Sequence, residues 1–330
     1  MSRLHLSIAT EAYDRVLALR DGRVQIEGCE HQVLLAGHEQ LFLRGFHNAE
    51  YDVCELSMSS YLIATAQGDC PYVAIPVFLS RLFRHSAIYV NSSSDITHPS
   101  QLKGKRMGVP EYQMTAALWA RGLLDDEYGV PPSAMEWFQG GLHEPGREEK
   151  LTLNLPADIS MRAIAPGATL NAMLCEGEID AVMTARAPRA FIEGDPRIVR
   201  LFPNYRQDEQ AYFRKTGIFP IMHVVAVRRT LVEQHPWLAN AVFDAFSRAK
   251  DLAVANFSDV SALRVTLPWF AAELEETRAI MGSDFWPYGV EANRKILSLM
   301  LDYAHRHGTV DRMLCFEEVF APSTLTEHKI

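Results

Sequence analysis

The chain has 330 residues, of which 48% are hydrophobic and 22% are charged, and 41 acidic against 32 basic side chains give a formal net charge of −9. The length suggests two domains, each large enough to bury its own core, and the composition excludes a disordered chain. The acidic balance argues against a nucleic-acid partner, because proteins that bind nucleic acids neutralise phosphates with clustered Lys and Arg.

The N-terminal segment Met1–Glu11 has too short an apolar stretch for an export leader and no small-residue cleavage site. No run approaches the roughly 18 apolar residues that a membrane span needs. We therefore expect a cytoplasmic protein without a membrane partner. Five widely spaced cysteines, none in a C-x-x-C pattern, argue against a disulfide framework and a thiolate zinc site.

Short β-type runs alternate with helical patterns, an order typical of βαβ units and parallel sheets. Strands are predicted over Leu4–Thr10, Tyr51–Leu56, Tyr72–Phe78, Ser86–Asn91, Arg106–Val109, Ala181–Thr184 and Met222–Val227. Helices are predicted between them over Glu39–Asn48, Met114–Tyr128, Thr169–Glu176 and Pro188–Ile192. Amphipathic helical patterns dominate the C-terminal part, over Pro236–Asn256, Pro268–Met281 and Glu291–His307.

Two extended runs, 86–90 and 223–227, bracket the middle third of the chain. They predict that the chain leaves one α/β lobe and later returns to it. The predicted division is a discontinuous lobe of residues 1–88 and 226–330, which carries the C-terminal helices, and an inserted α/β lobe of residues 89–225. Because ligands of open α/β sheets bind beyond the carboxyl ends of the strands, we expect the ligand in a cleft between the lobes.

Cationic and hydrogen-bonding residues follow several predicted strands, which favours an anionic, oxygen-rich small molecule. An arginine can bind both oxygens of a carboxylate, and backbone N–H groups at helix starts attract anions. The predicted substrate-binding residues are Arg81, Arg84, Ser59, Tyr112, Gln113, Thr115 and Arg186.

Three residues are candidates for proton transfer. His223 lies at the predicted return to the first lobe, and His85 shares a loop with the two arginines. Histidine titrates near neutral pH and can act as a general acid or base. Glu111, at the start of a predicted helix, is the candidate carboxyl group, with Glu11 after the first predicted strand as the alternative. Each assignment has a structural alternative, namely a surface ion pair for the arginines and a structural role with satisfied hydrogen bonds for His85.

Cofactor motifs are absent from the sequence. There is no H-E-x-x-H, Walker lysine loop, G-x-S-x-G or dinucleotide glycine pattern. His305 and His307 end a predicted helix, where the helix dipole favours cations, and they make a poor metal site. We therefore expect neither a cofactor nor a metal. The polar loop His143–Lys150 is predicted to be solvated.

Four longer blocks resemble the 4,5-dihydroxyphthalate decarboxylases: Arg81–Tyr89, Gly104–Thr115, Thr216–His223 and Asp284–Gly289. The resemblance extends from near residue 4 to near residue 325. It implies the two-lobed α/β fold of type 2 periplasmic binding proteins, here with a helical C-terminal segment. It also implies a dihydroxylated aromatic dicarboxylate as the substrate.

That substrate class suggests chemistry without an organic cofactor. Direct loss of CO2 would leave an aryl anion, whereas protonation of the ring carbon, with loss of the para hydroxyl proton, gives a dienone that releases CO2 and regains aromaticity. The protein must then supply a general acid, a partner for the phenolate and a clamp on the remaining carboxylate. We expect 3,4-dihydroxybenzoate and CO2 as products, and a homo-oligomeric assembly.

Another class of function uses the same residues. A cytosolic, non-catalytic solute-binding or sensor protein for an aromatic acid would need the arginines and the helix starts but no proton donor. Release of CO2 from the diacid distinguishes the two hypotheses.

Overall fold

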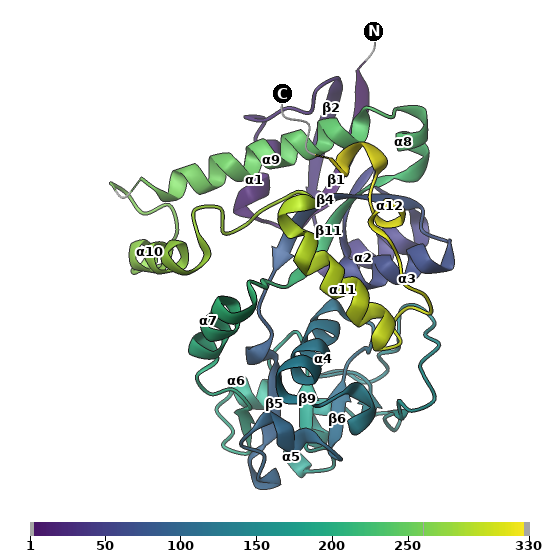
Figure 1. The fold of residues 1–330 in the computed structure, drawn as a ribbon, viewed down its shortest axis with the longest axis vertical. Helices are drawn as coiled ribbons and strands as arrows, with labels where there is room; N and C mark the ends of the chain where they lie inside the picture. The colour runs from purple at the N-terminus through teal and green to yellow at the C-terminus, as the bar shows by residue number, and fades with distance from the viewer. Residues whose placement is uncertain (1–2, 260, 327–330) are drawn as a thin grey trace.

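The computed structural model describes residues 3–259 and 261–326. Met1 and Ser2, which belong to the stretch considered for an export leader, lie outside this part. None of the helices in the described part combines the length and the apolar character needed to cross a membrane. Two mixed sheets with their helices lie one above the other along the long axis of the molecule, and both ends of the described chain lie in the same lobe (Figure 1).

The first sheet has the strand order β2-β1-β3-β11-β4. Its strands are β1 (Leu4–Thr10), β2 (Cys29–Leu35), β3 (Val53–Ser57), β4 (Tyr72–Arg81) and β11 (Ile221–Arg228). β1 runs parallel to β2 and β3, whereas β11 runs antiparallel to β3 and β4. The helices that belong to this lobe are α1 (Asp14–Arg20), α2 (His38–Asn48), α3 (Met58–Gln67), α8 (Arg229–Gln234) and α9 (Leu238–Phe257).

The second sheet has the order β10-β5-β9-β6-β7-β8. Its strands are β5 (Ile88–Asn91), β6 (Arg106–Val109), β7 (Glu136–Gln139), β8 (Met161–Ala163), β9 (Ala181–Met183) and β10 (Ile198–Arg200). β5 is antiparallel to its two neighbours, so both sheets are mixed and not purely parallel as the sequence pattern suggested. The helices of this part are α4 (Thr115–Tyr128), α5 (Leu170–Glu176), α6 (Arg189–Ile192) and α7 (Tyr205–Thr216).

The strands show where the chain changes sheet. The second sheet takes its strands from the stretch between Ile88 and Arg200, and β11 pairs within the first sheet from Ile221 onward. His223 is therefore a residue of the first sheet, although the predicted boundary at residue 226 places it in the inserted lobe. The division into lobes with the predicted limits stays a prediction.

Helix α4 connects the two lobes. Leu118 and Trp119 belong to the hydrophobic core of the first sheet, whereas Leu124 packs into that of the second. The Trp119 indole N–H donates to the backbone oxygen of Ile221 at 2.8 Å, directly at the start of β11. The start of α4 is therefore held against the edge of the first sheet, where the polar residues of both lobes meet.

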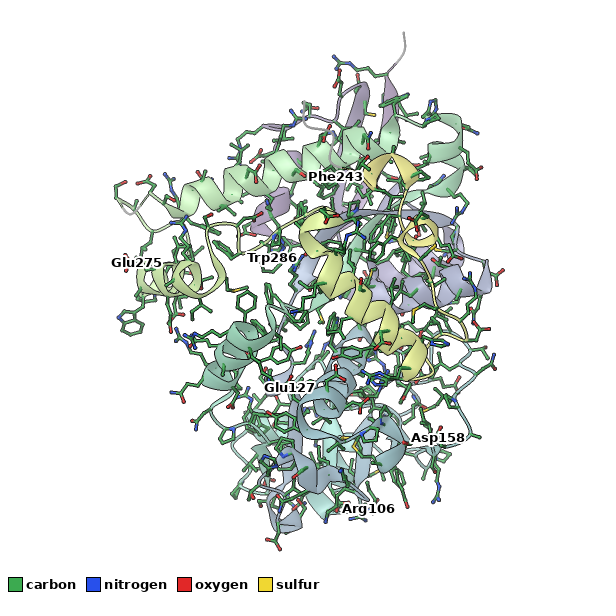
Figure 2. The ribbon with its side chains drawn as sticks, viewed as in Figure 1. Arg106, Glu127, Asp158, Phe243, Glu275 and Trp286 are labelled. Atoms are coloured by element: carbon green, nitrogen blue, oxygen red, sulfur yellow. The ribbon has the colours of Figure 1, made fainter. Side chains whose placement is uncertain are left out.

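The C-terminal segment is helical, as predicted. It contains α10 (Phe270–Met281), α11 (Arg294–Arg306) and the short α12 (Phe316–Val319). Figure 2 shows Glu275 on the outlying helix α10, whereas Trp286 lies back against the first lobe. The Trp286 indole N–H donates to the backbone oxygen of Phe78 at 2.8 Å and so attaches the returning segment to β4.

Candidate active site

Three strands of the first sheet present polar side chains at one edge. Glu55 and Ser57 lie two residues apart on β3 and therefore point to the same face. His223 on β11 is the register partner of Ser57, which places it diagonally across from Glu55. Residues from the end of β1 and the start of α2 complete the group. We call this group the Glu55 cluster: Glu11, Tyr13, His38, Glu55 and His223.

Glu55 is completely buried and accepts three hydrogen bonds. Its Oε1 accepts from the Tyr13 hydroxyl at 2.7 Å and from His223 Nδ1 at 2.6 Å, and its Oε2 accepts from the Glu11 backbone N–H at 3.0 Å. Burial acts to raise the pKa of Glu55, but the hydrogen bond and charge of His223, with the other two donors, outweigh it and hold the pKa below its usual value. The ionised carboxylate fixes a proton on Nδ1 of His223.

His38 extends this chain of hydrogen bonds. Its Nε2 lies 3.0 Å from the Tyr13 hydroxyl oxygen and pairs with the Glu11 carboxylate. Tyr13 donates its only hydroxyl proton to Glu55, so its oxygen accepts from His38, and Nε2 carries a hydrogen. Burial, followed by the charge of His223, lowers the pKa of His38 to about 4. The His38 ring is therefore neutral at neutral pH, and it packs edge-on against His223 with 4.6 Å between the centroids.

The residue types in this cluster also suit a metal ion. The ligand atoms of His38, Glu55 and His223 all lie within 4.8 Å of one another. Two ligand atoms bound to one zinc-sized cation at 90° or more must be at least about 2.9 Å apart, whereas Glu55 Oε1 and His223 Nδ1 are 2.6 Å apart. The described geometry is that of a hydrogen-bonded cluster. The expectation that no metal is used stays a prediction.

Side chains at the starts of helices α3 and α4 form a second polar group, which is continuous with the first. Thr115 Oγ1 lies 3.0 Å from Ser57 Oγ and accepts the Ser59 N–H at 3.0 Å. Ser60 Oγ donates to Gln113 Oε1 at 3.4 Å. Within the described residues, the buried Ser59 Oγ and Gln113 Nε2 have no hydrogen-bond partner. The backbone N–H groups of Tyr112 and Gln113, just before α4, already bind the Glu149 carboxylate, so the spare donors here are the side chains of Ser59 and Gln113.

Three of the predicted substrate-binding residues, Ser59, Gln113 and Thr115, are thus brought together from two lobes. Tyr112 lies beside them in sequence, but its side chain is buried, and its hydroxyl donates to the backbone oxygen of His307 at 3.0 Å. Substrate binding by these four residues stays a prediction.

The loop 143–150, predicted to be solvated, instead covers Glu111. That carboxylate is buried, and Arg147 Nε and Lys150 Nζ donate to it at 2.7 and 2.9 Å. The prediction was wrong for these two residues, because a buried carboxylate requires charged partners. Glu111 is a candidate catalytic residue whose charge is already paired within the protein, and its catalytic role stays a prediction.

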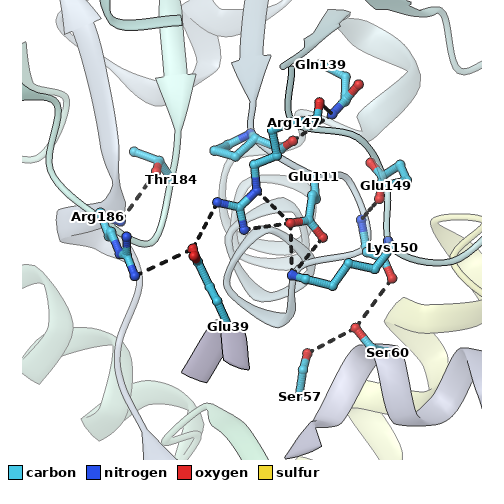
Figure 3. A network of polar contacts seen from close by, with 12 residues as sticks. Glu39, Ser57, Ser60, Glu111, Gln139, Arg147, Glu149, Lys150, Thr184 and Arg186 are labelled. Carbon is cyan, nitrogen blue, oxygen red and sulfur yellow. Dashed lines mark hydrogen bonds and ion pairs between the residues drawn. The ribbon is translucent and has the colours of Figure 1, made fainter. Parts of the chain in front are cut away.

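Glu39, the neighbour of His38, joins α2 to the second lobe. Figure 3 shows its carboxylate between two guanidinium groups, those of Arg147 at 3.1 Å and Arg186 at 3.5 Å. The Arg186 side chain is 70% exposed, and its positive charge acts on the pKa values of both Glu11 and His38. The structure therefore places the predicted substrate-binding Arg186 at the margin of the Glu55 cluster.

Arg81 and Arg84 are buried at the junction between the lobes. Arg81 donates to the backbone oxygens of Phe219 at 3.3 Å and Pro287 at 2.8 Å. The guanidinium of Arg84 contacts the sulfur of Met222 at 2.8 Å. These contacts attach the start of β11 and the C-terminal segment to the end of β4. Substrate binding by either arginine stays a prediction.

His85 lies away from the histidine pair, between the rings of Phe202 and Tyr212 at centroid distances of 5.1 and 5.3 Å. Its Nδ1 is buried with no hydrogen-bond partner in the described part of the chain. Burial lowers the pKa of His85 to about 4. The structure thus does not bring the two predicted catalytic histidines into one hydrogen-bonded group, and a catalytic role for His85 stays a prediction.

Replacing His85 with Gln is expected to reduce the amount by which the free energy of unfolding falls in mild acid. Between pH 6.5 and 4 the unfolded chain binds a proton at His85 that the folded protein does not, so the stability present above pH 6.5 is lost as pH falls toward the folded pKa. One such group accounts for at most about 1.4 kcal/mol per pH unit. Urea unfolding at several pH values measures the slope, with His5→Gln at an exposed position as the control. If the dependence of stability on pH is the same in His85→Gln and wild type, His85 takes up its proton in the folded protein as it does in the unfolded chain.

Sequence reasoning missed Tyr13, His38 and Glu55 as functional residues. The available signal was Glu55 itself, an acidic residue inside the otherwise apolar run 53–56. A charge in a buried strand requires partners, and those partners are the donors described above.

Comparison with known proteins agrees with this architecture. No family model matches the chain. The periplasmic aliphatic sulphonate binding protein SsuA from Escherichia coli is 15% identical, with a TM-score of 0.53, and the alignment covers 98% of this chain and 99% of that one. A putative periplasmic sulfonate-binding protein SsuA from Methylobacillus flagellatus KT is 13% identical over 98% of this chain and 93% of that one, with a TM-score of 0.54. The predicted two-lobed fold of type 2 periplasmic binding proteins is confirmed.

Curated relatives are much more similar in sequence. The 4,5-dihydroxyphthalate decarboxylase of Comamonas testosteroni is 45% identical over 330 residues, which are 100% of both chains. That of Pseudomonas putida is 46% identical over 202 residues, which are 61% of this chain and 78% of the relative. The chain belongs to the 4,5-dihydroxyphthalate decarboxylase family. The family predicted from the four sequence blocks is confirmed, and with it the prediction of a decarboxylase.

Proposed function

We propose that this protein converts 4,5-dihydroxyphthalate to 3,4-dihydroxybenzoate and CO2, without an organic cofactor or a metal. The observation that carries the proposal is the hydrogen bond between Nδ1 of His223 and the buried Glu55 carboxylate. It occurs in a chain that is 45% identical to a 4,5-dihydroxyphthalate decarboxylase along its full length. An imidazole held in this way by a carboxylate is oriented for proton transfer at its other nitrogen.

In the proposed reaction, Nε2 of His223 gives a proton to the ring carbon that bears the departing carboxylate. Glu55 stabilises the imidazolium that exists before this transfer. The hydroxyl para to that carbon loses its proton, so a dienone forms. The bond to the carboxylate then breaks, its electron pair returns to the ring, and CO2 leaves. One proton is consumed for each CO2 released.

The two polar groups of the site suit a substrate with two carboxylates, one of which leaves as CO2 while the other stays on the ring. The spare side-chain donors of Ser59 and Gln113 suit the carboxylate that stays. A tight grip on the departing carboxylate would stabilise the ground state as much as the transition state and would not speed the chemical step. Arg186, exposed at the margin of the Glu55 cluster, suits the attraction of the dianion into the cleft.

Other features of the proposal rest on sequence alone. We propose a cytoplasmic location, a homo-oligomeric assembly and no nucleic-acid or membrane partner. Roles for Arg81, Arg84, Tyr112, His85 and Glu111 in the reaction also remain proposals. The non-catalytic binding or sensor protein is the less favoured hypothesis, because the curated relatives are named as decarboxylases.

Purified protein is expected to release one CO2 for each 4,5-dihydroxyphthalate consumed, at a rate that gel filtration and chelation do not change. The reason is that the proposed steps use only the protein's own acid and base groups. CO2 release and the appearance of 3,4-dihydroxybenzoate measure the reaction, and untreated enzyme is the control. Activity that is lost on chelation and returns with a divalent cation would contradict the metal-free mechanism. A complete absence of CO2 release, before and after treatment, would contradict the function itself.

A further inference from the structure

The proposed reaction needs two proton-transferring groups at the same time. The ring carbon gains a proton while the para hydroxyl loses one. His223 has a single nitrogen for this purpose, because its Nδ1 hydrogen is bound by Glu55. The group that takes the hydroxyl proton must therefore be another residue near His223.

His38 presents a suitable nitrogen. Its ring lies edge-on to that of His223, with 4.6 Å between the centroids, although the two residues come from α2 and β11. Because Nε2 of His38 carries the hydrogen that Tyr13 accepts, the lone pair of the neutral ring is on Nδ1. Among the described residues, neither His38 Nδ1 nor His223 Nε2 has a hydrogen-bond partner, and the His38 side chain is 36% exposed. Neither nitrogen is therefore already held by a hydrogen bond in the described part of the protein.

The surroundings give the two rings opposite tasks. His223 is held at Nδ1 by the buried Glu55 carboxylate, which leaves Nε2 for the proton that the ring carbon gains. His38 is neutral, and the Glu11 carboxylate beside its Nε2 can stabilise the positive charge that the ring gains with a proton. A weak base is sufficient, because the para hydroxyl becomes strongly acidic once the ring carbon takes up a proton.

We propose that His38 is the catalytic base that removes the proton from the hydroxyl para to the departing carboxylate. This inference rests on the proposed function. The hydroxyl proton goes to Nδ1 of His38 as the proton of His223 goes to the ring carbon, and the dienone forms. When the carbon–carbon bond breaks, its electron pair restores the ring and leaves a phenolate, to which His38 returns the proton. Solvent then reprotonates His223.

The experiment uses the full-length protein with His38→Ala, and imidazole added as an external base. The variant is expected to lose about 10²–10⁴-fold in kcat, the usual contribution of a positioned acid or base. Binding of the product 3,4-dihydroxybenzoate should change by less than about tenfold, because the residues proposed to hold the carboxylate are intact. Added imidazole should raise the rate of the variant at least about tenfold. This increase should follow the concentration of neutral imidazole, so it should grow as pH rises.

Two further variants separate a base from a structural residue. His223→Ala should be rescued in the opposite sense, by the protonated form of imidazole and best at low pH. His47→Ala, an exposed position on the same helix α2, should keep wild-type kcat. His38→Gln, which keeps a donor for Tyr13, should fold and bind product but should be as slow as His38→Ala.

The inference fails if His38→Ala keeps kcat within about tenfold of wild type. It also fails if His38→Gln restores activity, or if rescue of His38→Ala follows the protonated imidazole. These failures differ from failure of the proposed function, in which the wild-type protein itself would release no CO2.

Discussion

Replacing His223 with Asn is expected to lower kcat by about 10²–10⁴-fold, while binding of a non-reactive aromatic diacid changes by less than about tenfold. Asparagine can still donate to Glu55 but has no group that titrates, so the transition state loses the proton donor and the ground state loses little. The measurements are kcat, the solvent deuterium isotope effect on CO2 release and calorimetric binding of the diacid.

The matched variant is His85→Asn. His85 lies between two aromatic rings and outside the Glu55 cluster, so this variant tests whether replacing any buried histidine would give the same result. If His223→Asn keeps kcat within about tenfold, the proton comes from another group. If His85→Asn causes the larger loss, the sequence-based assignment of His85 as the acid would be the correct one.

Replacing Glu55 with Gln is expected to lower kcat by at least about 10²-fold and to destabilise the fold by about 1–3 kcal/mol. The amide cannot carry the negative charge that orients His223 through its Nδ1 hydrogen bond. One of its two polar atoms is a donor, so at least one of the three donors that converge on Glu55 loses its acceptor. Kinetics and urea unfolding measure the two effects, with the exposed Glu50→Gln as the control.

The stability loss of Glu55→Gln should also depend on pH. The pKa of Glu55 in the folded protein lies below 4.5, so the stabilisation by its charge is fully present above that pH and is lost as pH falls through the folded pKa. Wild type and variant should therefore become more alike in strong acid. A difference in stability that stays constant down to the acid transition would show that charge is not the cause, and wild-type kcat in Glu55→Gln would remove Glu55 from the mechanism.

Local patterns in the sequence were sufficient for most of the secondary structure near the site. The predicted limits of β1 and β6 are those observed, and α2 and α4 each begin within one residue of the prediction. Hydrophobic alternation and helix starts are short-range signals, so one sequence contains them. Strands β2, β7, β8 and β10 were not predicted. β8 and β10 have only three residues each, and β2 contains the polar run Glu30-His31-Gln32 at the edge of its sheet.

The sequence also indicated which residue types surround the predicted cleft, but it could not indicate where each side chain points. A strand-end arginine that reaches backbone oxygens, such as Arg81, gives the same pattern as one that faces a ligand. The direction depends on the junction between the lobes and on the returning C-terminal segment, which are far from Arg81 in sequence.

By itself, the sequence determined the family, the two-lobed fold class, most of the elements, and His223 as a candidate acid. Only the tertiary structure decided which groups surround that histidine. Glu55 and His223 are separated by 168 residues and meet because β11 pairs antiparallel with β3, and His38 joins them from the start of α2. No local pattern in the sequence links these three residues to one another. Their chemistry arises from burial and mutual hydrogen bonds, which are properties of the packed chain and not of any local pattern.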